Sequence, residues 1–169
     1  MSQNLLKPNW DPGLSIQYLQ LQHLLDTGIK ALILDVDGTL LPRKEKTLHQ
    51  SVINWIKDAK TSFSLHLLSN NPSKKRIESI SKQLNINFTY KAAKPSRSAL
   101  RKVQQRLELS PKEIAIVGDR LFTDVLAGNR LGLYKVLVWP LGPNGKPSKK
   151  NTTQLIENSI AGFLGAGKS

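Results

Sequence analysis

The chain has 169 residues, no cysteine and a formal charge of +13 at pH 7, from 25 lysines and arginines against 12 aspartates and glutamates. This length suits one compact domain, expected over residues 1–169. Without cysteine, disulfides and thiolate metal sites are excluded, so a metal would need oxygen ligands, which Mg²⁺ prefers. The positive charge predicts an acidic partner, such as a polyanion or an anionic lipid surface.

The sequence offers no candidate for a membrane-spanning segment. No apolar run approaches the roughly 18 residues of a membrane-spanning helix, and the polar start Met1-Ser2-Gln3-Asn4 is unlike a secretory signal. We therefore expect a cytoplasmic protein that can also lie peripherally on a membrane surface.

The N-terminal part of the chain reads as an arm followed by a helix. Residues 1–13 contain two prolines and a glycine, so we expect an irregular arm there. Residues 14–26 have apolar residues at helical spacing, namely Leu14, Tyr18, Leu21 and Leu25, with Ile16, Leu19 and Leu24 widening the apolar stripe. The predicted helix could pack on the core or rest on a bilayer. Its glutamine-rich polar face favours the core, because membrane-surface helices usually carry lysines.

Strands and helices alternate along the rest of the chain. Strand-like runs cover residues 31–34, 64–68, 86–90, 114–117 and 134–139, and helical patterns begin at Thr47, after Ser73, after Pro95 and after Asp124. Alternation of this kind implies parallel crossovers, and it predicts an α/β fold of three layers, Rossmann-like, with a central parallel sheet. We expect a flexible loop over residues 141–150 and a terminal helix over residues 151–164.

Asp35 and Asp37 directly follow the apolar strand over residues 31–34 and precede a Gly-Thr turn. For an isolated Asp-x-Asp, solvated acids at a strand end are the simpler explanation. Burying both would cost several kcal/mol unless a cation or hydrogen bonds compensate. In a parallel sheet, ligands bind outside the carboxyl ends of the strands. Asp35, Ser69, Lys94 and Asp119 all follow strand-like runs, so we expect them to meet at one edge.

Four segments, in this order, resemble the motifs of the haloacid dehalogenase-like (HAD) phosphatases. They are Asp35-Val36-Asp37-Gly38-Thr39, Ser69 after Leu67-Leu68, Lys94 in Ala93-Lys94-Pro95, and Gly118-Asp119-Arg120-Leu121-Phe122-Thr123-Asp124. The resemblance implies a HAD-like fold and Mg²⁺-dependent hydrolysis of a phosphomonoester through an aspartyl-phosphate.

The resemblance also implies a role for each motif residue. Asp35 would be the nucleophile, and Asp37 would protonate the leaving group and then activate water. The metal would bind Asp35, the main-chain carbonyl of Asp37 and Asp119, with Asp124 as a further ligand or as a support for the other ligands. Catalysis would further use Lys94, and substrate would be bound by Ser69, Asn70 and Lys94. Apart from the resemblance, Arg97 lies on the helix that begins next to Lys94, so we expect it to bind substrate as well. Taken alone, Lys94 could be a solvated surface lysine and Ser69 a turn residue.

The spacing of the motifs leaves no room for a cap domain. Only about 29 residues separate Thr39 from Ser69, and about 24 separate Ser69 from Lys94. An open site can admit a phosphate on a large object, such as a protein, a nucleic acid end or a lipid at a membrane. The surrounding residues 71–106 are strongly basic, which is typical of a solvated face but also attracts anionic membranes.

Within the superfamily, the chain resembles the subclass III branch that contains mitochondrial and plastid phosphatidylglycerophosphate phosphatases. The string Gly-Asp-Arg-x-x-Thr-Asp-Val, residues 118–125, carries most of this likeness. It implies dephosphorylation of phosphatidylglycerophosphate to phosphatidylglycerol, with the acyl chains left in the bilayer. The alternatives are a HAD phosphatase of soluble phosphorylated metabolites and a non-catalytic nucleic-acid-binding protein. Few aromatic residues, 6% of the chain, speak against the last.

Overall fold

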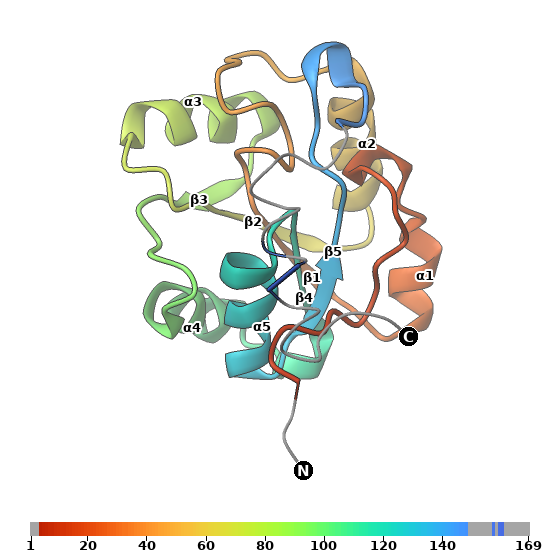
Figure 1. The fold of residues 1–169 in the computed structure, drawn as a ribbon, viewed down its shortest axis with the longest axis vertical. Coiled ribbons are helices and arrows are strands. Elements are labelled where there is room, and N and C mark those ends of the chain that lie inside the picture. The colour runs from red at the N-terminus through yellow and green to blue at the C-terminus, as the bar shows by residue number, and fades with distance from the viewer. Residues whose placement is uncertain (1–3, 149–156, 158, 161–169) are drawn as a thin grey trace.

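A computed structural model describes residues 4–148, 157, 159 and 160. Its centre is a five-stranded parallel sheet in the order β3-β2-β1-β4-β5 (Figure 1). The strands are β1 (Ala31–Leu34), β2 (Ser64–Leu68), β3 (Asn87–Thr89), β4 (Ile114–Gly118) and β5 (Tyr134–Leu137). The predicted α/β fold with a central parallel sheet is confirmed.

The central strand β1 is buried on both faces of the sheet. Ala31 lies opposite Ser64 of β2 and Ile114 of β4 in the parallel register. Leu32 and Leu34 belong to one apolar cluster, whereas Ala31 and Ile33 belong to another. Alternate residues of one strand therefore fill the cores on opposite faces, as a sheet covered by helices on both sides requires.

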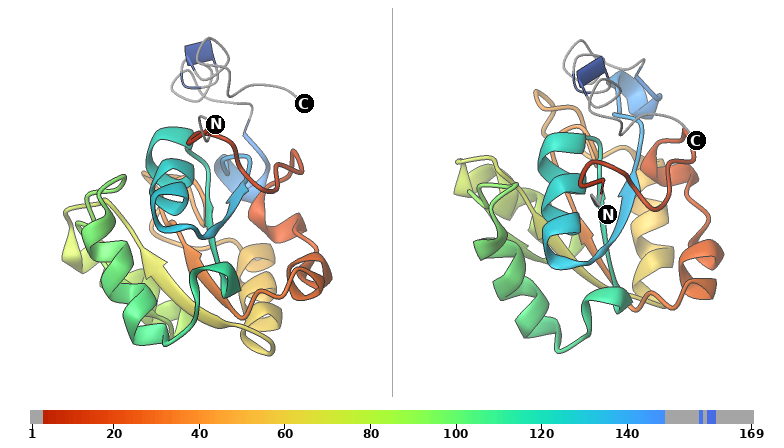
Figure 2. Two further views of the ribbon diagram at one scale, coloured as in Figure 1. Left: turned by 90° about the horizontal axis from the view of Figure 1, so that it is seen from below. Right: turned by 60° about the horizontal axis from the view of Figure 1, so that its bottom comes forward.

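Helices cover the two faces and complete the three layers (Figure 2). The first face carries α1 (Leu21–Asp26), α2 (Gln50–Lys60) and α3 (Lys74–Leu84), whose apolar residues join the cluster of Leu32 and Leu34. The second face carries α4 (Arg97–Leu107) and α5 (Leu126–Leu131). Only α2 and a loop separate β1 from β2, and only α3 and its loops separate β2 from β3, so these connections hold no cap domain.

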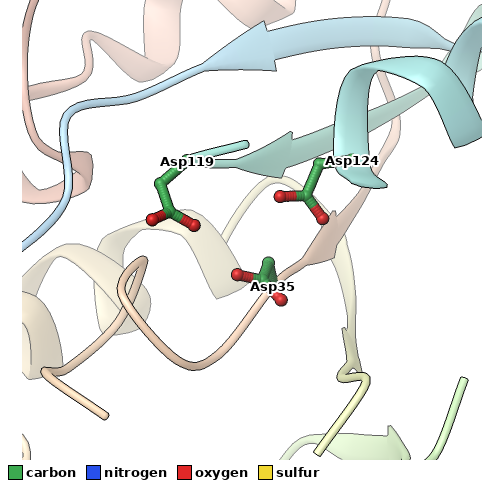
Figure 3. A group of neighbouring side chains, drawn as sticks. All are labelled: Asp35, Asp119 and Asp124. Carbon is green, nitrogen blue, oxygen red and sulfur yellow. The ribbon is translucent and has the colours of Figure 1, made fainter. Parts of the chain in front are cut away.

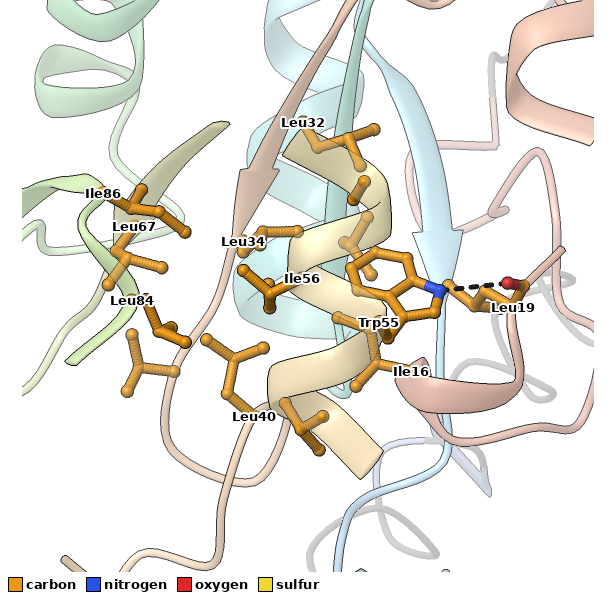
Figure 4. Close-up of a cluster of buried hydrophobic side chains, with 14 of the residues drawn as sticks. Ile16, Leu19, Leu32, Leu34, Leu40, Trp55, Ile56, Leu67, Leu84 and Ile86 are labelled. Atoms are coloured by element: carbon orange, nitrogen blue, oxygen red, sulfur yellow. Dashed lines mark hydrogen bonds between the residues drawn. The ribbon is translucent and has the colours of Figure 1, made fainter. Parts of the chain in front are cut away.

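The predicted helix over residues 14–26 is wrong in its first half. Ile16–Tyr18 forms one 3₁₀ turn, the chain is extended at Leu19 and Gln20, and only α1 is α-helical. The Trp55 indole donates to the Leu19 carbonyl at 3.0 Å, beside the buried Ile16 (Figure 4). This tertiary contact with α2 overrides the local helical pattern and changes which side chains are buried.

Only part of the expected apolar stripe is buried. Ile16, Leu19 and Leu24 are buried, whereas Leu14, Tyr18 and Leu25 are 39%, 54% and 37% exposed. The preceding arm is irregular, as expected, and it follows β5, because the main chains of Trp10 and β5 exchange hydrogen bonds. The arm thus covers the edge of the sheet that β5 would otherwise expose.

Several other boundaries differ from the sequence predictions by a few residues. The helix expected from Thr47 begins at Gln50, because His49 is its N-cap, and β3 and β5 are shorter than predicted. The hydroxyl of Ser73 caps α3 by accepting from the Arg76 amide at 3.3 Å, as predicted.

The C-terminal part is described only in places. Residues 141–148, which belong to the expected loop, contain a 3₁₀ turn and an antiparallel bridge. The predicted helix over residues 151–164 lies outside the described residues, apart from three helical positions, Glu157, Ser159 and Ile160. Among the helices that are described, none has the length and apolar character needed to cross a membrane.

Candidate active site

A cavity of about 190 Å³ opens at the carboxyl ends of the central strands. The residues that line it come from the segments following β1, β2 and β4 and from the turn before α4. They include Asp35, Asp37, Arg43, Ser69, Asn70, Lys94 and Arg120. The structure therefore brings these sequence-distant segments to one edge of the sheet, which is where α/β folds bind ligands.

Three carboxylates form a cluster at this edge (Figure 3). One oxygen each from Asp35, Asp119 and Asp124 lies within 4.8 Å of the others. Asp35 and Asp119 follow β1 and β4, while Asp124 lies on a π-helical turn, Leu121–Val125. A Cβ on Gly118 would overlap the Asp124 carboxyl group, so a glycine is needed for this turn to fold back over the strand end.

Lys94 is the cation that faces this cluster. Its Nζ donates to Asp35 Oδ1 at 2.8 Å, to Asp124 Oδ1 at 2.6 Å and to the Leu68 carbonyl at 2.9 Å. Only 2% of the side chain is exposed. Burial alone would lower its pKa, but the charges and hydrogen bonds of Asp124 and Asp35 outweigh burial and raise the pKa above its usual value. Lys94 is therefore protonated, and all its donors are used.

The cluster remains short of positive charge. Burial, with the charges of the other carboxylates, raises the pKa of Asp119 well above its usual value and that of Asp124 to about 6. Lys94 binds Asp35 and Asp124, and the charge of Arg120 acts on Asp119, yet the pKa values of Asp119 and Asp124 stay raised. An ion with a double positive charge would relieve the repulsion that remains. The donor set consists of oxygen atoms, so these residues can bind a hard metal ion.

Two further side chains position Asp35 and Lys94. The Thr39 hydroxyl lies 3.1 Å from Asp35 Oδ2 and 3.3 Å from Asp119 Oδ1. The Asn70 amide donates to the Lys94 carbonyl at 2.9 Å and accepts from the Lys94 amide at 2.7 Å. Asn70, expected to bind substrate, thus holds the main chain of Lys94, while it also lines the cavity.

Asp37 lines the cavity with Asp35 but has its own set of hydrogen-bond partners. Its Oδ1 accepts from Arg76 Nε and Nη2 at 3.0 and 2.7 Å, and its Oδ2 accepts from Asn71 Nδ2 at 2.8 Å. Arg76 also donates to the carbonyls of Glu45 and Pro42. The two acids of the first motif therefore have separate surroundings, which is the arrangement that two different chemical roles need.

The remaining site predictions have mixed outcomes. Ser69 is buried, lines the cavity and accepts from the Asn71 amide at 3.1 Å. Arg97 is exposed and is not among the residues of the cavity. Arg97 is the first residue of α4, which Ser96 caps, and its binding of substrate stays a prediction.

Sequence reasoning missed the contacts of Arg76 and Asn71. Arg76 lies within the basic run of residues 71–106, and Asn71 lies within the Ser-Asn-Asn string after β2. Nothing in the linear pattern pairs either side chain with Asp37, because the contact depends on how α3 and the loop after β1 pack.

A family model for mitochondrial PGP phosphatases matches residues 5–140. The chain belongs to this family. It is 32% identical over 128 residues to the probable phosphatase YqeG of Bacillus subtilis. The aligned residues are 75% of this chain and 74% of that protein. These matches identify the chain as a phosphatase.

Other relatives match less of their own length. Mitochondrial phosphatidylglycerophosphatase GEP4 of Saccharomyces cerevisiae is 41% identical over 56 residues, which is 33% of this chain and 28% of that protein.

Among solved structures, the cobalt-bound deoxy-D-mannose-octulosonate 8-phosphate phosphatase YrbI of Haemophilus influenzae shares the fold. Its TM-score is 0.53 at 17% identity, covering 82% of this chain and 91% of that chain. The two chains therefore share their fold.

Proposed function

We propose that the protein is a Mg²⁺-dependent phosphatase that acts through an aspartyl-phosphate and converts phosphatidylglycerophosphate to phosphatidylglycerol. The observation that carries the chemistry is the contact of one buried carboxylate, Asp35, with Lys94 at the mouth of the cavity. The family and its relatives of that name support the substrate.

In the first proposed step, Asp35 attacks phosphorus and the bond to the leaving oxygen breaks. Asp37 gives its proton to that oxygen, so that phosphatidylglycerol leaves as an alcohol. Ser69 binds a phosphoryl oxygen, and the positive charge of Lys94 offsets the charge that builds up on the phosphoryl group. Thr39 and Lys94 hold the Asp35 carboxylate in place, so the nucleophile needs little reorientation before it attacks phosphorus.

In the second proposed step, Asp37, now ionised, takes a proton from water as the water attacks the phosphoryl group on Asp35. The acyl-phosphate bond breaks, inorganic phosphate is released and Asp35 returns as a carboxylate. Asp35, Asp119, Asp124 and the main-chain carbonyl of Asp37 would hold Mg²⁺, which would offset the negative charge of the phosphoryl group.

The absence of a cap in the described connections supports a substrate that is part of a larger body. The phosphate would enter the cavity while the acyl chains stay in the bilayer, with the protein on the membrane surface. The positive charge of the chain, +13, favours such an anionic surface.

The decisive assay compares phosphate release from phosphatidylglycerophosphate in mixed micelles with release from soluble phosphomonoesters, with and without EDTA. We expect Mg²⁺-dependent release that prefers the lipid. Preference for the soluble panel would overturn the lipid substrate and favour a metabolite phosphatase. The variant Asp35→Asn should be folded and inactive, and an active one would end the proposed mechanism.

A further inference from the structure

A second, basic pocket lies beside the active site. It has a volume of about 420 Å³ and is lined by Lys46, from the loop before α2, and by residues of α3 and its cap, namely Ser73, Lys75, Arg76, Ser79 and Ile80. Three of its lining residues are cationic, and none is acidic. Such a lining suits an anion with several oxygen acceptors.

Arg76 connects this pocket with the active site. It lines the basic pocket, and its guanidinium also binds the Asp37 carboxylate, which lines the cavity at the sheet edge. The side chains of this ion pair are only 16% and 9% exposed. The ion pair thus stands where the two spaces approach each other.

The proposed mechanism predicts which part of the substrate lies near Arg76 and the basic pocket. Asp37 must lie next to the leaving oxygen if it is to protonate that oxygen. The rest of the substrate is attached to the leaving oxygen, so it extends from the cavity on the Asp37 side. Beyond Asp37 on that side lie Arg76 and the basic pocket.

We propose that the basic pocket binds the phosphodiester group of the substrate, which a glycerol unit joins to the phosphomonoester in phosphatidylglycerophosphate. This inference rests on the proposed function and deepens it. Lys46 and Lys75 are the cations for this group, because Arg76 is already bound to Asp37. Among the described residues, neither lysine forms an ion pair with a carboxylate. Ser73 and Ser79 add hydroxyl groups that can donate to the phosphodiester oxygens.

The test uses soluble substrates, so that attraction to a membrane surface does not enter. The deacylated headgroup, glycerophosphoglycerol phosphate, contains both phosphates, whereas glycerol 3-phosphate contains only the phosphomonoester. We expect the wild type to prefer the headgroup. The double variant Lys46→Ala/Lys75→Ala should lose about tenfold in kcat/KM for the headgroup, chiefly through a higher KM, and should keep its rate on glycerol 3-phosphate.

A matched control and a second variant complete the design. Lys82 also lies on α3, but it does not line the pocket. Its side chain is 76% exposed, and its Nζ lies 3.8 Å from Glu78 Oε1. The control variant Lys82→Ala should therefore leave the kinetics of both substrates unchanged. Charge reversal in Lys75→Glu should deepen the loss for the headgroup alone. Equal losses on both substrates, no loss, or no preference of the wild type for the headgroup would overturn the subsite. If the proposed function itself were wrong, the result would be different: the intact lipid would release no phosphate in a Mg²⁺-dependent manner.

Discussion

Two nitrogen atoms of the Arg76 guanidinium donate to one oxygen of Asp37, Nε at 3.0 Å and Nη2 at 2.7 Å. The same guanidinium donates to the Glu45 carbonyl through Nη1 and to the Pro42 carbonyl through Nη2. Arg76 therefore fixes both the orientation of Asp37 and the loop that follows it. Because Arg76 contacts Asp37 rather than the phosphate, we regard it as a positioning residue.

Replacing Arg76 by lysine should separate positioning from binding. One ammonium group cannot reproduce the planar guanidinium contacts, so Asp37 should lose its fixed orientation. For glycerol 3-phosphate, we expect Arg76→Lys to lower kcat by about 10- to 100-fold with little change in KM. Arg101, exposed on α4, gives the control variant Arg101→Lys. A large rise in KM with normal kcat would contradict the positioning role.

Lys94 should matter for stability as well as for catalysis. Lys94→Met should be inactive, and without Mg²⁺ it should be about 3–5 kcal/mol less stable in urea denaturation, because buried carboxylates lose their cation. Adding Asp124→Asn should recover part of this loss, since the double variant removes both partners of the 2.6 Å ion pair. Lys102→Met, an exposed site on α4, is the control. Additive losses in the double variant would argue against the coupling.

The alternating patterns predicted the parallel sheet, because strand and helix periods are local properties of the chain. The N-terminal segment shows where this reasoning fails. Its spacing predicted one wide helical stripe, but the structure buries Ile16 and Leu19 of that stripe and leaves Leu14 and Tyr18 exposed. That outcome depends on the hydrogen bond between Trp55 and the Leu19 carbonyl, a contact between residues 36 positions apart. No local pattern encodes such a contact.

In the active site too, some residues could be predicted from local motifs and others depend on tertiary packing. The motif resemblance pointed to Asp35, Lys94, Asp119 and Asp124, and the structure brings their side chains together. Arg97 was chosen because it lies close to Lys94 in sequence; it is exposed at the start of α4, and its contact with substrate stays a prediction. Arg76 is far from Asp37 in sequence and is held to it only by the packing of α3, so it could not have been chosen from spacing.

Metal binding should stabilise the folded protein. An ion that binds the carboxylate cluster only in the folded state adds about 3 kcal/mol at a concentration 100 times its dissociation constant. For a chain of this size, the melting temperature should rise by about 5–10 °C with Mg²⁺. Gly118→Ala should abolish the rise, because the new Cβ overlaps the Asp124 carboxyl group.

Two further variants keep this prediction testable if Gly118→Ala folds poorly. Asp119→Asn removes one charge from the cluster and should reduce the Mg²⁺-induced rise. Asp58→Asn changes an exposed acid on α2 and should leave the rise as in the wild type. An equal rise in Asp119→Asn and the wild type would place the ion elsewhere.

His66 on β2 should make stability depend on pH. Its Nε2 lies 2.9 Å from the Thr89 hydroxyl, and burial, with the charge of Arg106, lowers its pKa from 6.5 to about 4. Below pH 6.5 the unfolded chain takes up a proton that the folded protein does not bind until about pH 4. The contribution of His66 is therefore complete above pH 6.5 and is lost as the pH falls to 4, by about 2–3 kcal/mol.

Urea denaturation between pH 7 and pH 4.5 measures this contribution as a difference between proteins. His66→Gln keeps a polar group near Thr89 but cannot titrate, so it should lose less stability over this interval than the wild type. His49→Gln, at an exposed cap position, should behave as the wild type. Carboxylates titrate in both proteins and cancel in the comparison. If His66→Gln and the wild type lose the same free energy, the imidazole is not the group that takes up the proton on unfolding.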